Sequence, residues 1–282
     1  MPAHRPALPR RIPLAVTGVV TAIVALCLVA GLVLVPRPHA ATPSQPPARE
    51  VLPAAARTPV VEPSTEAEAA PAAEPVETVE LAARSVNCAV AKCVALTFDD
   101  GPGRHTARLL NSLKASNTKA TFFVLGNATT TRPALVRRAA AEGHVVASHG
   151  WDHKQFTRLG AAAQRDQLRR TASAITRAGA PAPKLFRPPY GSYNATTRSL
   201  GTPIILWDVD PLDWKYRSVS SVTRRVMAQV KPGSIVLLHD IHGTTVDAVP
   251  GIIRQLKAKG YTLVTVPELL KSQKAGQVYS RR

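Results

Sequence analysis

Two histidines with a short spacing are the clearest candidates for chemistry in this chain. His149 and His153 stand four residues apart in the segment Ser-His-Gly-Trp-Asp-His. This spacing places both imidazoles on one face of a helical turn, as is typical of metal ligands. One carboxylate would complete a two-histidine, one-carboxylate site with open positions for water and substrate, which suits zinc or another divalent transition metal. Without a carboxylate, two ordinary polar histidines are the alternative.

Carboxylates are scarce in residues 86–282, which contain 11 acidic residues. Six of them lie at or just after the ends of apolar runs: Asp99, Asp100, Asp208, Asp210, Asp213 and Asp240. Asp99 and Asp100 are adjacent in Thr-Phe-Asp-Asp-Gly-Pro. Taken alone, such a segment predicts a turn more often than a catalytic pair.

Three other segments carry polar or aromatic groups after apolar runs. Arg187 begins Arg-Pro-Pro-Tyr-Gly, whose prolines would hold a rigid loop, either beside a groove or simply at the surface. Trp207 and Trp214 each have a carboxylate as neighbour, which suits the faces of sugars but equally a packed loop. His239 follows the apolar run Ile-Val-Leu-Leu and adds a group that titrates near neutral pH.

The elements that must position these groups alternate along the chain. We expect strands at 94–98, 120–125, 144–147, 184–186, 204–207, 234–238 and 262–264. We expect helices at 106–115, 133–141, 159–178 and 246–259. This alternation indicates a parallel sheet covered by helices, open or closed into a barrel. Active sites of such folds gather at the C-terminal ends of the strands, where we expect Asp99, His149, Arg187, Asp208 and His239.

Together these segments resemble the polysaccharide deacetylase family, carbohydrate esterase family 4. The resemblance covers about residues 86–282 and rests on five segments in the family's order: TFDDGP at 97–102, His149 with His153, RPPYG at 187–191, DPLDW at 210–214 and LLHD at 237–240. It implies a distorted (β/α) barrel that forms a single catalytic domain. It also implies hydrolysis of acetyl groups on a polysaccharide.

The resemblance assigns the metal and the general base. It implies that Asp100, His149 and His153 hold a divalent metal ion, zinc first and cobalt as the alternative. Asp99 would be the general base, and Arg187 would orient it and tune its basicity.

The resemblance also assigns the groups that meet the acetyl group. His239 would be the general acid, oriented by Asp213. The backbone amide of Tyr190 would help to stabilise the oxyanion, while Leu237 and Trp214 would line the acetyl pocket.

Two positions differ from the usual pattern of the family. Gly150 stands where a Ser or Thr commonly follows the first metal histidine, so hydrogen bonding around that ligand is expected to be weaker. The variable segment 103–105 is expected to shape the rim of the groove.

The N-terminal part differs from the rest in composition. Residues 14–35 contain no charge, and as a helix they are long enough to cross about 30 Å of hydrocarbon. The arginines of the short segment 1–13 predict that it stays in the cytoplasm and that the remainder is exported. An apolar run of this length favours a retained anchor over a signal peptide. Residues 36–85, rich in Pro, Ala and Glu and without aromatic residues, predict a disordered linker.

Charge and cysteines support an extracellular domain. Residues 86–282 carry 29 basic residues, so the net charge of +18 lies entirely on this part. Outside the cell such a charge favours anionic wall polymers or lipid head groups over nucleic acid, although a generally basic soluble surface is the alternative. Cys88 and Cys93 are expected to form a disulfide, and a thiolate zinc site is the weaker alternative because no histidine lies nearby.

The preferred function is deacetylation of N-acetylglucosamine in peptidoglycan, because an anchor followed by a linker would place the domain within the cell wall. A secreted chitin or chito-oligosaccharide deacetylase and an acetylxylan esterase are the alternatives. A glycan-binding module without activity is a fourth, and the complete set of expected catalytic residues speaks against it.

Overall fold

The computed structural model describes residues 86–282. The predicted cytoplasmic segment 1–13, the anchor 14–35 and the linker 36–85 lie outside the described residues. None of the helices in the described part combines the length and the apolar character needed to cross a membrane.

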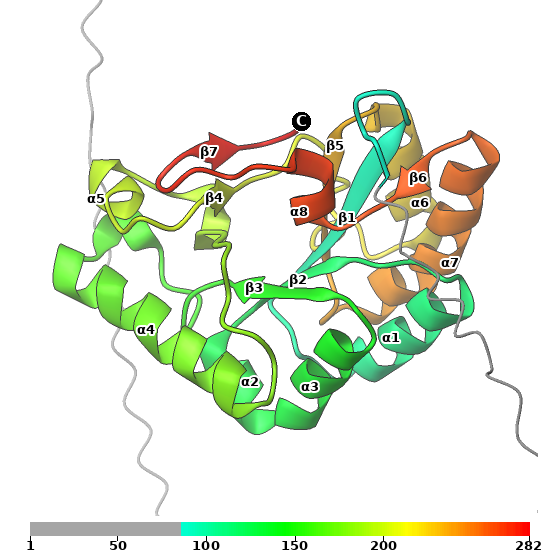
Figure 1. The fold of residues 1–282 in the computed structure, drawn as a ribbon. Helices are drawn as coiled ribbons and strands as arrows, with labels where there is room; N and C mark the ends of the chain where they lie inside the picture. Colours follow the sequence, from blue (N-terminus) through cyan, green and yellow to red (C-terminus); the bar gives the residue numbers. More distant parts are fainter. Residues whose placement is uncertain (1–85) are drawn as a thin grey trace, which may run out of the picture. The chain divides into compact units, whose positions relative to one another are not determined.

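A parallel sheet forms the centre of the fold (Figure 1). Its strands run in the order β3 (Val145–Ser148), β2 (Thr121–Val124), β1 (Cys93–Asp99) and β5 (Ser234–His239). Every residue of β1 is buried, as expected for a strand covered on both faces. β6 (Thr262–Leu263) pairs with the first residues of β1.

Single bridges close this sheet into a distorted barrel. Phe186 bridges Ser148 at the end of β3 and Ile204 at the start of β4 (Ile204–Ile205), and Val209 bridges Val236 in β5. The barrel prediction is therefore confirmed. The expected strand at 184–186 is reduced to one bridging residue, Phe186, because prolines flank it on both sides and lack the N–H that pairing needs. β7 (Val278–Tyr279) pairs with β4.

Helices surround the strands (Figure 1). They are α1 (Thr106–Ala115), α2 (Gly126–Thr131), α3 (Pro133–Ala141), α4 (Ala161–Arg177), α5 (Ala195–Arg198), α6 (Val219–Gln229), α7 (Gly243–Ala258) and α8 (Val266–Leu270). Short 3₁₀ turns occur at Phe156–Arg158 and Pro189–Gly191. The four expected helices correspond to α1, α3, α4 and α7. The sequence did not predict α2, α5, α6 or α8. The Thr-rich sequence of α2 has low helix propensity.

The two faces of β1 separate the core from the site. Alternate residues of β1 pack with the helices in the larger cluster: Val94, Leu96 and Phe98. Ala95 packs in a second cluster with Phe123, Ile205 and Ile235 from the other barrel strands. Because side chains alternate along a strand, Asp99 lies on the same face as Ala95. The alternation of side chains along β1 therefore directs Asp99 toward the mouth of the barrel.

A disulfide joins Cys88 to Cys93 at the start of β1, with Cα atoms 5.4 Å apart. Both cysteines are buried in the second cluster. The cross-link fastens the chain where it enters the barrel, and no zinc-binding thiolate pair is present in the described part of the chain.

Candidate active site

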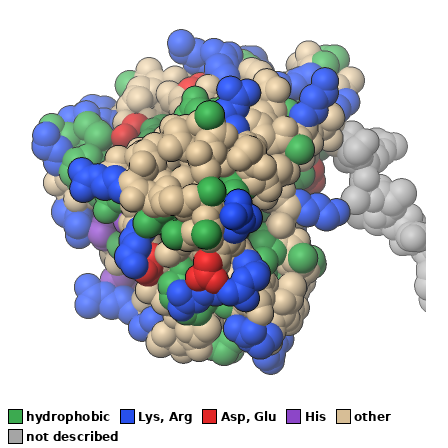
Figure 2. Space-filling model, turned by 90° about the vertical axis from the view of Figure 1, so that its left-hand side faces the viewer, with side chains coloured by type: hydrophobic (Ala, Val, Ile, Leu, Met, Phe, Trp, Pro, Cys, Tyr) green, Lys and Arg blue, Asp and Glu red, His purple; other side chains and the backbone are tan. Residues whose placement is uncertain are grey.

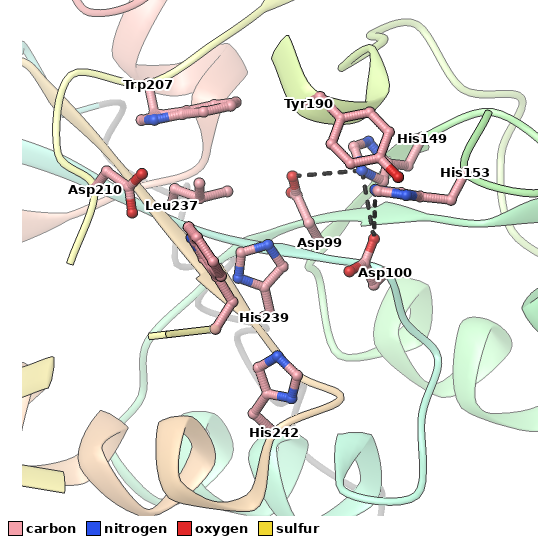
Figure 3. A pocket seen from close by; sticks show the side chains of 11 residues that line it. Asp99, Asp100, His149, His153, Tyr190, Trp207, Asp210, Leu237, His239 and His242 are labelled. Atoms are coloured by element: carbon pink, nitrogen blue, oxygen red, sulfur yellow. Dashed lines mark ion pairs between the residues drawn. The ribbon is translucent and has the colours of Figure 1, made fainter. Parts of the chain in front are cut away.

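The C-terminal ends of the central strands meet at one pocket. β1 and β5 are in register such that Asp99 lies beside His239. The pocket has a volume of about 440 Å³, and its lining residues are Asp99, Asp100, His149, His153, Tyr190, Trp207, Asp210, Trp214, Leu237, His239 and His242 (Figure 3). The expectation that the site lies at the C-terminal ends of the strands is therefore correct for the pocket.

Three side chains form a group that could hold a metal ion. Oδ1 of Asp100 is 3.5 Å from Nε2 of His149 and 3.4 Å from Nε2 of His153 (Figure 3). All three potential ligand atoms lie within 4.8 Å of one another. Two ligands of a tetrahedral zinc, each about 2 Å from the ion, stand about 3.3 Å apart. The spacing of the three atoms fits a divalent ion.

Two further observations support a metal in this place. Oδ1 of Asp100 is buried without a hydrogen-bond partner in the described part of the chain, a costly arrangement that a cation would relieve. Nδ1 of His149 lies 2.7 Å from the carbonyl oxygen of Arg187, so Nδ1 must carry the proton that it donates. This leaves Nε2 with a free lone pair toward Asp100. Burial lowers the pKa of His149 and favours the neutral imidazole that metals bind.

The prediction that the two histidines lie on one helical turn is wrong. His149 follows β3 directly, and the chain to His153 is an irregular loop in which Gly150 has φ 79° and His153 has φ 60°. The imidazoles nevertheless converge, with ring centroids 5.2 Å apart. The four-residue spacing therefore identified two histidines that lie together, although the backbone between them is a loop and not a helical turn.

Gly150 is suited to its place in this loop. Its φ lies in the left-handed region, where a side chain is strained. An added Cβ would lie 3.1 Å from the ring of Phe156 and 3.3 Å from Oε1 of Gln167. That same Oε1 accepts a hydrogen bond of 2.6 Å from the backbone N–H of Trp151. The amide of Gln167 thus supports the loop between the histidines.

Asp99 is held by a buried arginine. Nη1 of Arg187 donates to Oδ1 of Asp99 at 2.7 Å and to the hydroxyl of Thr97 at 2.8 Å. Nε and Nη2 donate to the carbonyls of Ile205 and Leu206 at 3.0 and 2.9 Å. Arg187 has no exposed surface, and a buried charge of this kind persists only when it is paired. Oδ1 of Asp99 is thereby occupied, while Oδ2 faces the pocket, 3.7 Å from Nε2 of His149.

His239 is paired with a buried carboxylate in a similar way. Its Nδ1 lies 2.8 Å from Oδ1 of Asp213, whose Oδ2 accepts from the backbone N–H of His239 and from the hydroxyl of Thr245. Burial opposes the charged imidazolium, but Asp213, with the charges of Asp99 and Asp100, outweighs it and raises the pKa of His239 to about 9. His239 is therefore protonated at neutral pH, and its Nε2 is left free to donate.

The remaining expected residues also line the pocket. Tyr190 has φ 61°, and its ring lies 4.6 Å from that of His153. Leu237 and Trp214 both line the pocket, and Leu237 lies on the opposite side of it from His149 and His153 (Figure 3).

Asp208 does not belong to the site, contrary to expectation. It accepts hydrogen bonds from the hydroxyl of Ser234 and the backbone N–H of Ile235, at 2.9 and 2.8 Å. Both partners lie at the start of β5, whereas the pocket lies at its end. The chain continues past β4 to bridge β5 at Val209, so Asp208 is carried away from the strand ends.

Two pocket residues had no expected role. Asp210 opens the DPLDW segment and is half-buried, and burial raises its pKa. His242 comes three residues after His239 and precedes α7. The DPLDW segment was a sequence signal for Asp210. His242 had no such signal, because it reaches the pocket only through the turn after β5.

A buried carboxylate supports the loop that carries Asp100. Asp240, directly after β5, has no exposed surface, and burial raises its pKa to about 7. It accepts a hydrogen bond from the hydroxyl of Thr106, which in turn accepts from the backbone N–H of Gly103 at 2.7 Å. A Cβ at Gly101 would lie 2.4 Å from Oδ1 of Asp240. The loop after Asp100 therefore packs directly on Asp240.

Gly101→Ala is expected to weaken metal binding about tenfold or more, because the new methyl group must push the Asp100 loop off Asp240. Chelator competition on the folded protein measures this. Gly160→Ala is the matched control, since no atom lies within 4 Å of its added Cβ. Equal metal affinity in both variants would contradict the packing argument.

Comparison with known proteins agrees with this geometry. The polysaccharide deacetylase family model matches residues 87–202. A peptidoglycan-N-acetylglucosamine deacetylase, PgdA of Listeria monocytogenes, is 45% identical over 180 residues, which are 63% of this chain and 39% of that protein. A peptidoglycan-N-acetylglucosamine deacetylase of Bacillus cereus is 39% identical over 64% of this chain and 69% of its own length.

A solved structure agrees as well. The structure of the peptidoglycan deacetylase PdaC from Bacillus subtilis has a TM-score of 0.64 at 41% identity, covering 66% of this chain and 93% of that one. The chain spans about two fifths of the length of the Listeria relative. The shared fold, together with 39% identity over 69% of the length of the Bacillus cereus relative, establishes that the chain belongs to the polysaccharide deacetylase family.

Proposed function

We propose that this chain is a metal-dependent hydrolase that removes N-acetyl groups from N-acetylglucosamine in a cell-wall polysaccharide, with peptidoglycan as its substrate. One observation carries the proposal. A single pocket joins a metal-ligand group to a carboxylate held by Arg187 and to a histidine held by Asp213. Similarity to deacetylases that act on peptidoglycan supports the choice of polymer.

The metal proposed is zinc, with cobalt as the alternative, held by Asp100, His149 and His153. When bound, such an ion polarises an acetyl carbonyl and lowers the pKa of water. The chain's own contribution is to fix the ligands, through the hydrogen bond from His149 to Arg187 and the packing of the Asp100 loop on Asp240.

Asp99 and His239 move the protons in this proposal. Oδ2 of Asp99 takes a proton from the attacking water, while Arg187 holds Oδ1 and fixes the carboxylate's orientation. His239, protonated at neutral pH, gives its Nε2 proton to the departing sugar nitrogen. The C–N bond breaks, and acetate and a free amine leave. The register that pairs Asp99 with His239 supports a proposal in which both groups act on one bond.

Three residues receive the acetyl group. The backbone N–H of Tyr190 donates to the oxyanion that develops on the acetyl oxygen. Leu237 and Trp214 offer apolar surface to the methyl group, since both line the pocket.

We also propose an extracellular place for residues 86–282, held at the membrane by residues 14–35 through the linker 36–85. Cleavage after the apolar segment would instead give a secreted enzyme. Figure 2 shows Lys and Arg side chains spread over one face with few Asp and Glu among them, which suits anionic wall polymers. Nucleic acid is not a proposed partner.

Acetate release from three substrates tests the proposal. With zinc or cobalt we expect the highest kcat/KM on peptidoglycan, loss of activity with a chelator, and recovery when metal is restored. Faster turnover of chitin oligomers or acetylxylan would reassign the polymer. No acetate from any of the three, with metal shown to be bound, would favour a glycan-binding module and contradict the proposal.

A further inference from the structure

The exposed segment that begins at Trp214, at the rim of the pocket, carries positively charged side chains. Residues 214–217 are exposed, whereas Asp213 just before them is fully buried. Nε of Arg217 donates a hydrogen bond of 2.8 Å to the carbonyl oxygen of Trp214. Trp214 lines the pocket, so this bond holds the guanidinium beside the backbone of a pocket residue.

The positive charge of Arg217 also acts on His242, another residue that lines the pocket. His242 lines the pocket beside His239, with ring centroids 5.9 Å apart. Burial and the positive charge of Arg217 together lower the pKa of His242. The side of the pocket formed by Trp214 and His242 therefore lies in the field of a cation.

No carboxylate of the described residues forms an ion pair with Arg217. Within 214–246 the sole acidic residue is Asp240, which is fully buried. Two neighbouring cations, Arg225 and Lys215, pack against the ring of Tyr216, at 4.1 and 5.4 Å from its centre. The Nη1 and Nη2 groups of Arg217 thus remain available to an external acceptor.

A neutral sugar polymer has no charge for such a group to recognise. In peptidoglycan, every second sugar carries a lactyl ether that ends in a carboxylate or continues into an acidic peptide. A guanidinium binds a carboxylate through two parallel hydrogen bonds, which adds both affinity and orientation.

We propose that Arg217 forms a subsite for a carboxylate on the sugar next to the one that is deacetylated. This inference rests on the proposed function and adds a basis for choosing an anionic glycan over a neutral one.

Kinetics on two substrates test the subsite. The first is glycan strands freed of peptide, which carry lactyl carboxylates, and the second is neutral N-acetylglucosamine oligomers. Arg217→Gln is expected to lower kcat/KM on the strands roughly five- to tenfold, mainly through KM, and to leave the neutral oligomers within about twofold. Arg217→Lys should recover part of the loss, because the charge remains.

Arg198→Gln is the matched control, since Arg198 is also exposed and also donates through Nε to a backbone carbonyl, that of Gly276. It should leave both substrates unchanged. Equal losses on both substrates in Arg217→Gln, or no loss on either, would overturn the subsite alone. Absence of turnover in the wild-type protein on both substrates would overturn the proposed function, and the subsite with it.

Discussion

Asp99→Asn is expected to lower kcat by about 10²- to 10⁴-fold while the protein still binds its metal. The amide keeps the shape of the carboxylate and can still accept the hydrogen bond from Arg187. It has no basicity, however, so it cannot take the proton from water. Asp99 is not one of the three metal-ligand residues, and metal content should therefore be largely preserved.

Metal analysis beside kinetics checks this result. His149→Ala should behave differently, losing metal because it removes one of the three proposed ligands. Asp208→Asn is the matched control for the loss of a carboxylate, since Asp208 bonds to Ser234 and Ile235 at the far end of β5. Equal metal loss in Asp99→Asn and His149→Ala would refute the separate roles of base and ligand.

Asp213→Asn is expected to shift the alkaline limb of the kcat/KM profile to lower pH. A general acid works only while it is protonated, so activity falls as pH rises through its pKa. The Asp213 carboxylate is the leading cause that holds the pKa of His239 up, at about 9. Without that charge, burial lowers the pKa, and we expect a loss on the order of 10²-fold at alkaline pH.

The full pH profile of kcat/KM measures this shift. Asp247→Asn is the control, because Asp247 is an exposed carboxylate on α7 that pairs with Arg108 away from the pocket. Its profile should match the wild type. An unchanged alkaline limb in Asp213→Asn would show that His239 does not act as the acid or that Asp213 does not tune it.

The sequence was most informative where the end of a strand decides the position of a residue. Asp99 could be placed at the mouth of the barrel because it follows directly on the apolar run 94–98. The same rule misplaced Asp208, because it assumes that each run stops at the mouth. The run after Ile204 continues to pair with β5 instead.

Local backbone geometry in the site could not be predicted. Asp100, His153, Tyr190 and Leu212 all have positive φ, between 54° and 72°. Such conformations cost about 1–3 kcal/mol each for residues other than glycine, and only surrounding contacts can hold them. Those contacts come from distant parts of the chain. The carboxylate of Asp240, for example, packs against the loop that follows Asp100.

The loss of acetyl groups from peptidoglycan, counted together with the amines that appear, tests the central claim most directly. Metal-loaded protein incubated with peptidoglycan should release acetate and expose free amino groups in a ratio of about one to one, because amide hydrolysis yields one of each. Acetate without new amines would indicate ester hydrolysis. Neither product, with metal bound and Asp99 and His239 intact, would contradict the account.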